Sequence, residues 1–316
     1  MDQRIYQEIN KEIGQEKIKN LHKPIFIFDL FAVIGIPTIF LLNIYYLGIY
    51  PISFIWLMVL IFQAFLIQIF QLAAHELFTH RKVLGNNLSY YVSFIYFLPL
   101  FLSPTLYRKF HMLHHRYSNT ADDPEEFKQD LDKRWKRFLF LTFIGQLLAP
   151  SRIFYAGKPE EFKQPITFDP KSDIGKKIKF EYKIVLVFIL SVITLLWFFP
   201  NYVIWGYLVP FLGIVPFLYS IRLIIEHADT DTQNPFSIAT NYKTNILTRA
   251  LFFYDSGDCH LVHHIFPNIP FYKIQKMNLA IEPVLQKHGV RQHRSLLKLL
   301  YCYYVLNLPH RSVYPE

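Results

Sequence analysis

The chain has only two cysteines, Cys259 and Cys302, among its 316 residues. Two thiols exclude an iron–sulfur cluster and a rubredoxin-type site, each of which needs more cysteine ligands. Glycine-rich nucleotide-binding fingerprints and internal repeats are also absent from the sequence. Charged residues make up only 18% of the chain, against 52% apolar residues. This balance argues against an ordinary soluble protein and favours a membrane protein.

Lysine and arginine are absent from two long blocks, residues 25–74 and 184–221, in which Asp29 is the only acid. A bilayer core of about 30 Å needs about 20 apolar residues per helical crossing, so each block has room for two crossings. The sequence therefore predicts four membrane spans, in two hairpins: Ile25–Tyr46, Ile52–Ala74, Ile184–Phe199 and Tyr202–Ile225.

Neither hairpin turn carries lysine or arginine, whereas basic residues crowd the opposite ends of the spans. The positive-inside rule then predicts a multi-pass protein with both termini on the cytoplasmic side, and it explains the net charge of +9 without nucleic-acid binding. Because residues 1–23 are polar, we expect no secretory signal peptide. We expect one domain over residues 1–316, divided into a cytoplasmic segment 1–24, a hairpin 25–74, a cytoplasmic or interfacial segment 75–183, a hairpin 184–225 and a cytoplasmic segment 226–316.

Four shorter segments are apolar or apolar-periodic without being long enough to cross a bilayer. The stretch Leu88–Ser103 fits a re-entrant or interfacial segment, which keeps both of its flanks on one side of the membrane. We expect an interfacial piece over Phe138–Tyr155, and helices over Lys273–His288 and Leu296–Leu306. These helices would cap a site at the membrane surface.

Nine of the 13 histidines fall into four clusters, and two clusters repeat the spacing His-x-x-His-His. On a helix this spacing gathers three imidazoles within about 100° of arc. Neutral imidazoles packed together satisfy their lone pairs best on a metal ion. His75 and His80 do not share a face of an α-helix, but the other clusters favour them as ligands too. The clustered histidines are His75 and His80; His111, His114 and His115; His227; and His260, His263 and His264.

The number of histidines indicates two metal ions, because a single zinc site takes at most four protein ligands. Imidazole-rich sites suit iron in redox work with O₂. Glu226 and Asp258, each next to or near a clustered histidine, are predicted to orient ligand imidazoles through the second ring nitrogen. The scattered histidines are predicted to be structural: His22, His288, His293 and His310.

The clusters resemble the three histidine boxes of the membrane fatty acid desaturase and hydroxylase superfamily, over about residues 74–270. The box around His75 and Glu76 is similar to that of alkane hydroxylases, whereas the ending His263-His264-Ile265-Phe266-Pro267 is similar to that of acyl desaturases. Many desaturases have Asn where this chain has Asp258. The resemblance implies an all-α integral membrane fold in which a cytoplasmic helical cap carries the boxes. It also implies that the nine histidines bind two irons, with His227 as the extra ligand after the last span.

The chemistry implied is O₂-dependent oxidation of an unactivated C–H bond in a lipid, with fatty acyl desaturation as the first reading. A hydroxylase or ketolase of an alkane, carotenoid or other lipid is the alternative, and a zinc-dependent membrane hydrolase or a metal-binding receptor is an alternative of another class. The sequence has no flavin, haem or iron–sulfur signature, so we expect an external electron donor of the ferredoxin, cytochrome b5 or rubredoxin type. Its docking residues would be Arg108, Lys109 and Arg116.

Overall fold

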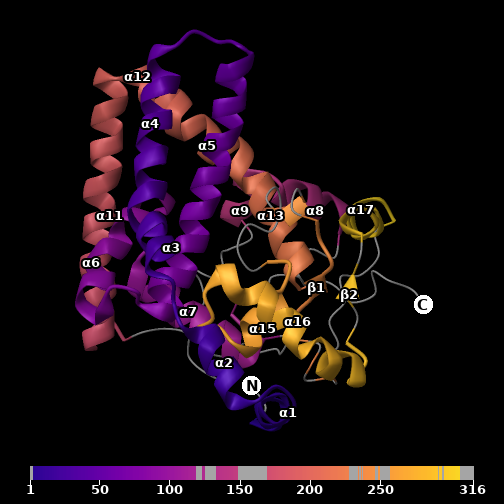
Figure 1. Cartoon of the computed structure of the whole chain (residues 1–316). Helices are drawn as coiled ribbons and strands as arrows, with labels where there is room; N and C mark the ends of the chain where they lie inside the picture. Colours follow the sequence, from indigo (N-terminus) through magenta and orange to yellow (C-terminus); the bar gives the residue numbers. More distant parts are fainter. Residues whose placement is uncertain are drawn as a thin grey trace.

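The structure is a computed structural model, in which almost every described element is a helix (Figure 1). It describes residues 3–118, 123–124, 133–148, 169–227, 234, 236, 238–245, 248–249, 257–290, 292–293 and 295–306. The all-α prediction is confirmed, and two strands of two residues each, β1 (Asn241–Tyr242) and β2 (Gln292–His293), form a small parallel pair.

Four helical stretches are long and apolar enough to cross a membrane, as the sequence predicts. The first, Gln15–Ile49, contains α2 (Gln15–His22), α3 (Phe26–Leu30), η1 (Phe31–Gly35) and α4 (Ile36–Ile49). The second, Phe54–Arg81, contains α5 (Phe54–Ala73) and the π-helix η2 (Ala74–Arg81). The third is α11 (Asp173–Phe198), and the fourth, Pro200–Glu226, contains α12 (Pro200–Val203), η5 (Ile204–Leu208), η6 (Pro210–Ile214) and α13 (Val215–Glu226).

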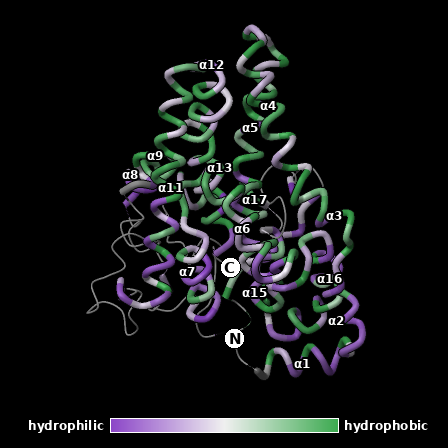
Figure 2. The backbone as a smooth tube through the Cα atoms, turned by 90° about the vertical axis from the view of Figure 1, so that its left-hand side faces the viewer, coloured by the Kyte–Doolittle hydropathy of each residue, from purple (hydrophilic) through white to green (hydrophobic). Residues whose placement is uncertain are grey.

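The second and fourth stretches form the inside of the bundle. About half of their most apolar windows is buried, at 50% and 56%, against 11% in the first and third stretches. The outer helices expose large apolar side chains, such as Phe26 and Trp197, and Figure 2 shows hydrophobic residues along the upper bundle. An exterior of this kind suits lipid rather than water.

Close backbone contact joins the inner helices to α4. A Cβ atom added to Gly206 would lie 2.9 Å from the Cα atom of Ile44, so only glycine allows this approach. Gln63 Nε2 donates to the carbonyl oxygen of Gly206 at 2.8 Å and reaches that of Phe40 at 3.4 Å. The amide therefore ties three helices together inside the bundle.

The third stretch is longer than its predicted span, Ile184–Phe199, since α11 begins at Asp173. The side chain of Ser172 caps the helix by accepting a hydrogen bond from Gly175 N at 3.0 Å. Lysine and glutamate residues end the uncharged run at Lys183, but they do not end the helix. The predicted segment boundary at 183/184 therefore lies inside α11.

The predicted re-entrant segment Leu88–Ser103 falls on α6 (Gly85–Phe97) and η3 (Leu98–Leu100). The chain then bends by 87° into α7 (Pro104–Tyr117), which gives the pair the shape of a broken span or a re-entrant loop. Ser103 caps α7 by accepting from Leu106 N, and Pro104 occupies its first turn. The bend directs α7 and its histidines toward the lower end of α5.

The remaining helices gather at that lower end (Figure 1). Here α1 (Gln3–Ile13) and α2 pack on α15 (His260–Ile265) and α16 (Phe271–Lys287), with Ile5, Ile9 and Ile18 in a shared buried core. The predicted helices at Lys273–His288 and Leu296–Leu306 correspond to α16 and to α17 (Leu296–Leu300) with η8 (Tyr301–Val305). The predicted piece at Phe138–Tyr155 contains most of α8 (Arg134–Phe140) and α9 (Phe143–Leu148), and its residues 149–155 lie outside the described residues.

Candidate metal centre

The first pair of candidate ligands lies on a π-helix. In an α-helix His75 and His80 would point about 140° apart, because each residue advances about 100°. In η2 the hydrogen bonds run from residue i to i+5, which widens the turn and brings residues five apart onto nearly the same side. The two imidazole ring centroids lie 4.8 Å apart. The π-helix therefore brings His75 and His80 together, although an α-helix would point two residues with this spacing apart.

The second and third boxes lie on α7 and α15, which hold His111, His114 and His115 and His260, His263 and His264. Five of these six side chains are buried and that of His115 is half-buried. His227 follows the last residue of α13 and is also buried. All nine histidines singled out from the sequence thus meet at the junction between the bundle and the lower helices.

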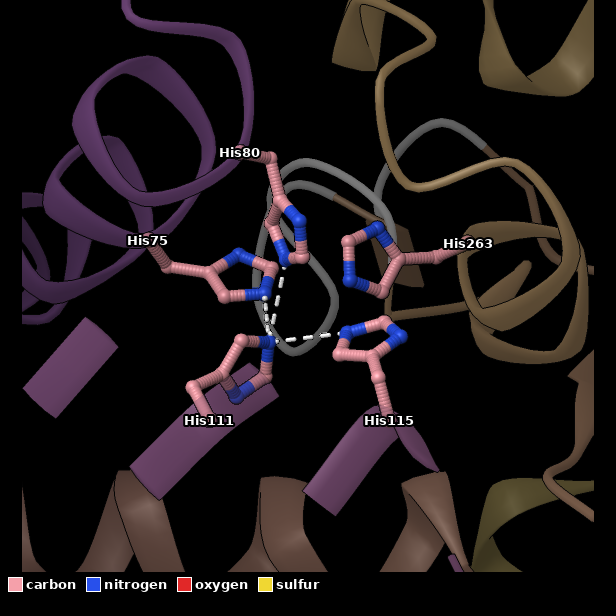
Figure 3. A group of neighbouring side chains, drawn as sticks. All are labelled: His75, His80, His111, His115 and His263. Carbon is pink, nitrogen blue, oxygen red and sulfur yellow. Dashed lines mark hydrogen bonds between the residues drawn. The ribbon is translucent and has the colours of Figure 1, made fainter. Parts of the chain in front are cut away.

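The nine imidazoles divide into two groups, and within each group the candidate ligand atoms lie within 4.8 Å of one another. We call them the five-histidine group and the four-histidine group. Figure 3 shows the rings of the first group turned toward a common centre. The five-histidine group is His75, His80, His111, His115 and His263; the four-histidine group is His114, His227, His260 and His264.

Each His-x-x-His-His motif serves both groups. On α7, His111 and His115 belong to the five-histidine group and His114 to the other. On α15 the assignment is reversed, because His260 and His264 belong to the four-histidine group and His263 to the five-histidine group. Residues four apart lie on one helical face, and the residue between them points to the neighbouring face. The repeated motif therefore suits two adjoining sites better than one.

The nitrogen spacings fit metal ligation. His111 Nε2 lies 2.8 Å from His75 Nε2, 3.0 Å from His80 Nε2 and 2.9 Å from His115 Nε2. In the other group, His260 Nε2 lies 3.1 Å from His227 Nε2 and 3.2 Å from His264 Nε2. Imidazole nitrogens bound at about 2.1 Å to one ion stand about 3 Å apart when they subtend a right angle. The donor set is therefore compatible with one ion in each group.

Burial favours the neutral form of His263 and His264. Desolvation lowers the pKa of His263 and His264 well below the usual value of 6.5, and the neighbouring imidazoles lower it further. His263 Nε2 is buried without a hydrogen-bond partner. A neutral imidazole with an unused buried lone pair is the form that binds a metal ion.

A carboxylate that the sequence analysis did not single out orients one of the rings. His114 Nδ1 lies 2.9 Å from Asp123 Oδ1 and 3.1 Å from Oδ2, and both side chains are buried. This contact leaves Nε2 of His114 for a metal ion. The only available signal was an acid within ten residues after the second box, which by itself is common in polar loops.

The two carboxylates predicted to orient ligands lie differently. Glu226 Oε1 lies 3.7 Å from His260 Nδ1 and accepts a hydrogen bond from Arg222 Nε at 2.5 Å. Asp258 Oδ2 accepts from Thr244 Oγ1 at 2.6 Å, Arg249 Nε at 2.8 Å and Gln275 Nε2 at 2.6 Å. Glu226 is thus near a ligand candidate, whereas the described contacts of the Asp258 side chain anchor the loop before α15.

Two of the four scattered histidines make contacts outside the groups. His22 Nδ1 lies 2.9 Å from the carbonyl oxygen of Ile18. His288 Nε2 lies 2.8 Å from Glu8 Oε2, and its ring stacks on Phe236 with centroids 4.0 Å apart. The side chain of His293 and all of His310 lie outside the described residues.

A cavity of about 340 Å³ opens beside the candidate centre. His75 and His111 of the five-histidine group and His114, His227 and His260 of the four-histidine group line it. Much of the remaining wall is apolar, with leucines and phenylalanines from η3, α7, α8, α9 and η6. A largely apolar cavity that ends on both histidine groups can hold a lipid-like molecule against bound metal ions.

Comparison with known proteins gives two matches. The family model described as fatty acid desaturase matches residues 54–295, which include all nine clustered histidines. The chain is also 27% identical over 298 residues to dihydrorhizobitoxine desaturase of Bradyrhizobium elkanii, and the match covers 85% of this chain and 78% of that relative. The matched region begins at α5 and ends just before α17.

Proposed function

Because the chain belongs to the fatty acid desaturase family, we propose that it desaturates a lipid-like substrate in an O₂-dependent reaction at the two histidine groups. Two hydrogen atoms leave neighbouring carbons of the substrate. O₂ takes them up with two electrons from a donor and two protons, and two water molecules form. The observation that carries the proposal is the convergence of nine imidazoles in two groups beside a largely apolar cavity.

We propose iron in both groups, with His75, His80, His111, His115 and His263 holding one ion and His114, His227, His260 and His264 the other. Bound iron supplies the one-electron chemistry with O₂ that amino-acid side chains cannot provide. Nine imidazoles are too many for one ion, and an imidazole-rich donor set suits iron in redox work with O₂. The zinc-hydrolase alternative therefore has less support.

The protein's own residues would position the substrate and exclude water. Apolar side chains such as Phe110, Phe140 and Phe211 form part of the cavity wall and would hold a hydrocarbon segment beside the histidines. Asp123 would fix the ring of His114, and Glu226 would act on His260. These groups are positioning residues, because none of them is expected to exchange atoms with the substrate.

Desaturation is favoured over hydroxylation by the relative's name, which specifies a desaturase. At 27% identity we do not transfer that relative's substrate. Hydroxylation stays the second candidate because the box around Glu76 is similar to that of alkane hydroxylases. The two reactions differ in whether a second hydrogen atom leaves the substrate or an oxygen atom enters it.

We propose that the lower end of the molecule, which carries the boxes, faces the cytoplasm and receives electrons there, and that both termini are cytoplasmic. Arg108 and Lys109 line a second cavity of about 480 Å³ together with Lys82 and Lys177, and Arg116 lies nearby on α7. This concentration of positive charge would attract an acidic donor protein and makes the rate of electron delivery sensitive to salt.

The deciding experiment measures metal content and lipid products together. Protein expressed in iron-replete medium and purified in detergent should hold about two irons per chain, and the expressing cells should gain new alkenes. His111→Ala should lose iron and products, whereas His22→Ala, whose ring lies outside both histidine groups and contacts Ile18 and Phe266, should keep both. One zinc per chain without iron would overturn the proposal, and new alcohols without alkenes would replace desaturation by hydroxylation.

A further inference from the structure

Two glutamines of α5 line the cavity on the same helical face as His75. Gln71 lies four residues before His75 and Gln68 lies seven residues before it, which are the spacings of one face of an α-helix. Gln68 is only 1% exposed. Seven residues of α-helix span about 10 Å, so Gln68 lies about that far along the axis from the first candidate ligand.

Gln68 has unused hydrogen-bonding capacity. Its Nε2 donates to Gln71 Oε1 at 3.3 Å, while its Oε1 is buried without a hydrogen-bond partner. A buried carboxamide in an apolar helix is costly when one of its polar atoms is unsatisfied. Since Gln68 lines the cavity, its side chain lies in the wall against which a bound molecule would pack.

Gln63 on the same helix shows what a structural glutamine does here. It is 0% exposed, and its Nε2 binds backbone carbonyl oxygens of α4 and η5. Its Oε1 is also unpartnered, but Gln63 does not line the cavity. Gln63 is packed between α4 and η5, so a molecule in this cavity would not contact it. The two glutamines therefore differ in access and not in residue type, helix or burial.

The cavity wall is polar on other elements as well. Arg222 and Glu226 line it from α13, where they form a buried ion pair, and Gln146 lines it from α9. Gln146 Nε2 is held by the carbonyl oxygen of Pro216 at 2.6 Å and by Ser220 Oγ at 3.0 Å. These groups already have partners within the protein, and Glu226 has a role beside His260, whereas Gln68 Oε1 has no partner.

We propose that Gln68 and Gln71 form a hydrogen-bonding subsite and that the substrate carries a hydroxyl or amide group within about 10 Å of the carbons that react. A hydroxyl or a secondary amide can both donate and accept, so it satisfies Gln68 whichever way the carboxamide is turned. The substrate is then a functionalised chain and not an unsubstituted alkyl chain. This inference rests on the proposed function, because it takes the cavity to be the substrate site.

Binding to the full-length, metal-loaded protein in detergent tests the subsite without turnover. The probes are octadecanoic acid and a series of monohydroxyoctadecanoic acids in which the hydroxyl moves along the chain. Wild-type protein should bind one or two neighbouring positional isomers about tenfold more tightly than octadecanoic acid. Equal affinity across the series would overturn the proposal.

Variants assign that preference to Gln68. Gln68→Leu should remove the roughly tenfold preference and keep or increase the affinity for octadecanoic acid, and Gln68→Met provides a second variant of similar side-chain length. The matched control is Gln63→Leu, which should keep the preference even where it lowers thermal stability. Preference that survives in both Gln68 variants would overturn the proposal. Isomer preference in a protein that produces no alkene would instead contradict the proposed function and leave the subsite standing.

Discussion

The five-histidine group and the four-histidine group use the same side chain in different surroundings. All members of the four-histidine group are buried, whereas His80 and His115 of the five-histidine group are half-buried. Asp123 and Glu226 approach the four-histidine group through His114 and His260. A carboxylate at the second ring nitrogen raises the basicity of a ligand imidazole. Two ions of the same element would therefore differ in affinity and in redox behaviour.

The largest expected effect is the loss of activity and iron when His263 or His264 is replaced. These two histidines are adjacent in sequence but belong to different groups. Either alanine substitution should lower activity by about 100-fold or more, since each removes a candidate ligand. His264→Ala leaves three histidines in its group and should lose more iron per chain than His263→Ala, which leaves four. Elemental analysis of both variants makes the comparison, and equal iron content in the two would contradict the division into groups.

A largely buried ion-pair network that includes Glu76 and Arg81 of the first box region gives the next effect. Arg81 donates to Asp29 Oδ2 at 2.5 Å and to Glu76 Oε1 at 2.7 Å, with all three side chains at most 13% exposed. Asp29→Asn removes one of the two carboxylates that compensate the guanidinium and should cost about 3 kcal/mol of stability. Thermal unfolding in detergent measures this loss of stability, and an unchanged melting temperature would contradict the expectation. Asp173→Asn, at an exposed carboxylate, is the control.

A smaller effect is expected for the carboxylate that holds His114. Asp123→Asn keeps the shape of the side chain but removes its charge, so activity or iron affinity should fall by about tenfold. Iron titration of the metal-free protein measures the affinity. The loss should fall on the four-histidine group, and weakening of both groups by the same factor would indicate general unfolding instead.

The smallest effect is expected for a histidine outside both groups. His288→Ala removes the contacts with Glu8 and Phe236 at the junction of α1 and α16. Iron content and product yield should match those of the wild type, with only a slight fall in melting temperature. Loss of iron in this variant would mean that the histidines have been grouped wrongly.

Much of the fold and the candidate site was predictable because each depends on a local pattern. The uncharged runs predicted four helices long enough to span a membrane. The histidine spacing predicted the nine residues that come together in the two groups. Periodicity of 3.6 residues could not reveal η2, since a π-helix follows from a local shift of backbone hydrogen bonds. The pairing of Asp123 with His114 and the unsatisfied Oε1 of Gln68 depend on tertiary contacts that no sequence spacing encodes.

The order of the boxes along the chain sets the time at which the centre can form. Both groups combine residues from η2 or α7 with residues of α15, near the opposite end of the chain. The chain is synthesised from its N-terminus. The first two boxes are therefore made before α11 and α13, and the histidines of α15 are made only after those helices. Neither group is complete in a nascent chain that stops before His260. If the proposed metal centre forms, metal loading would therefore be a late event of biogenesis, after all four candidate spans have been made.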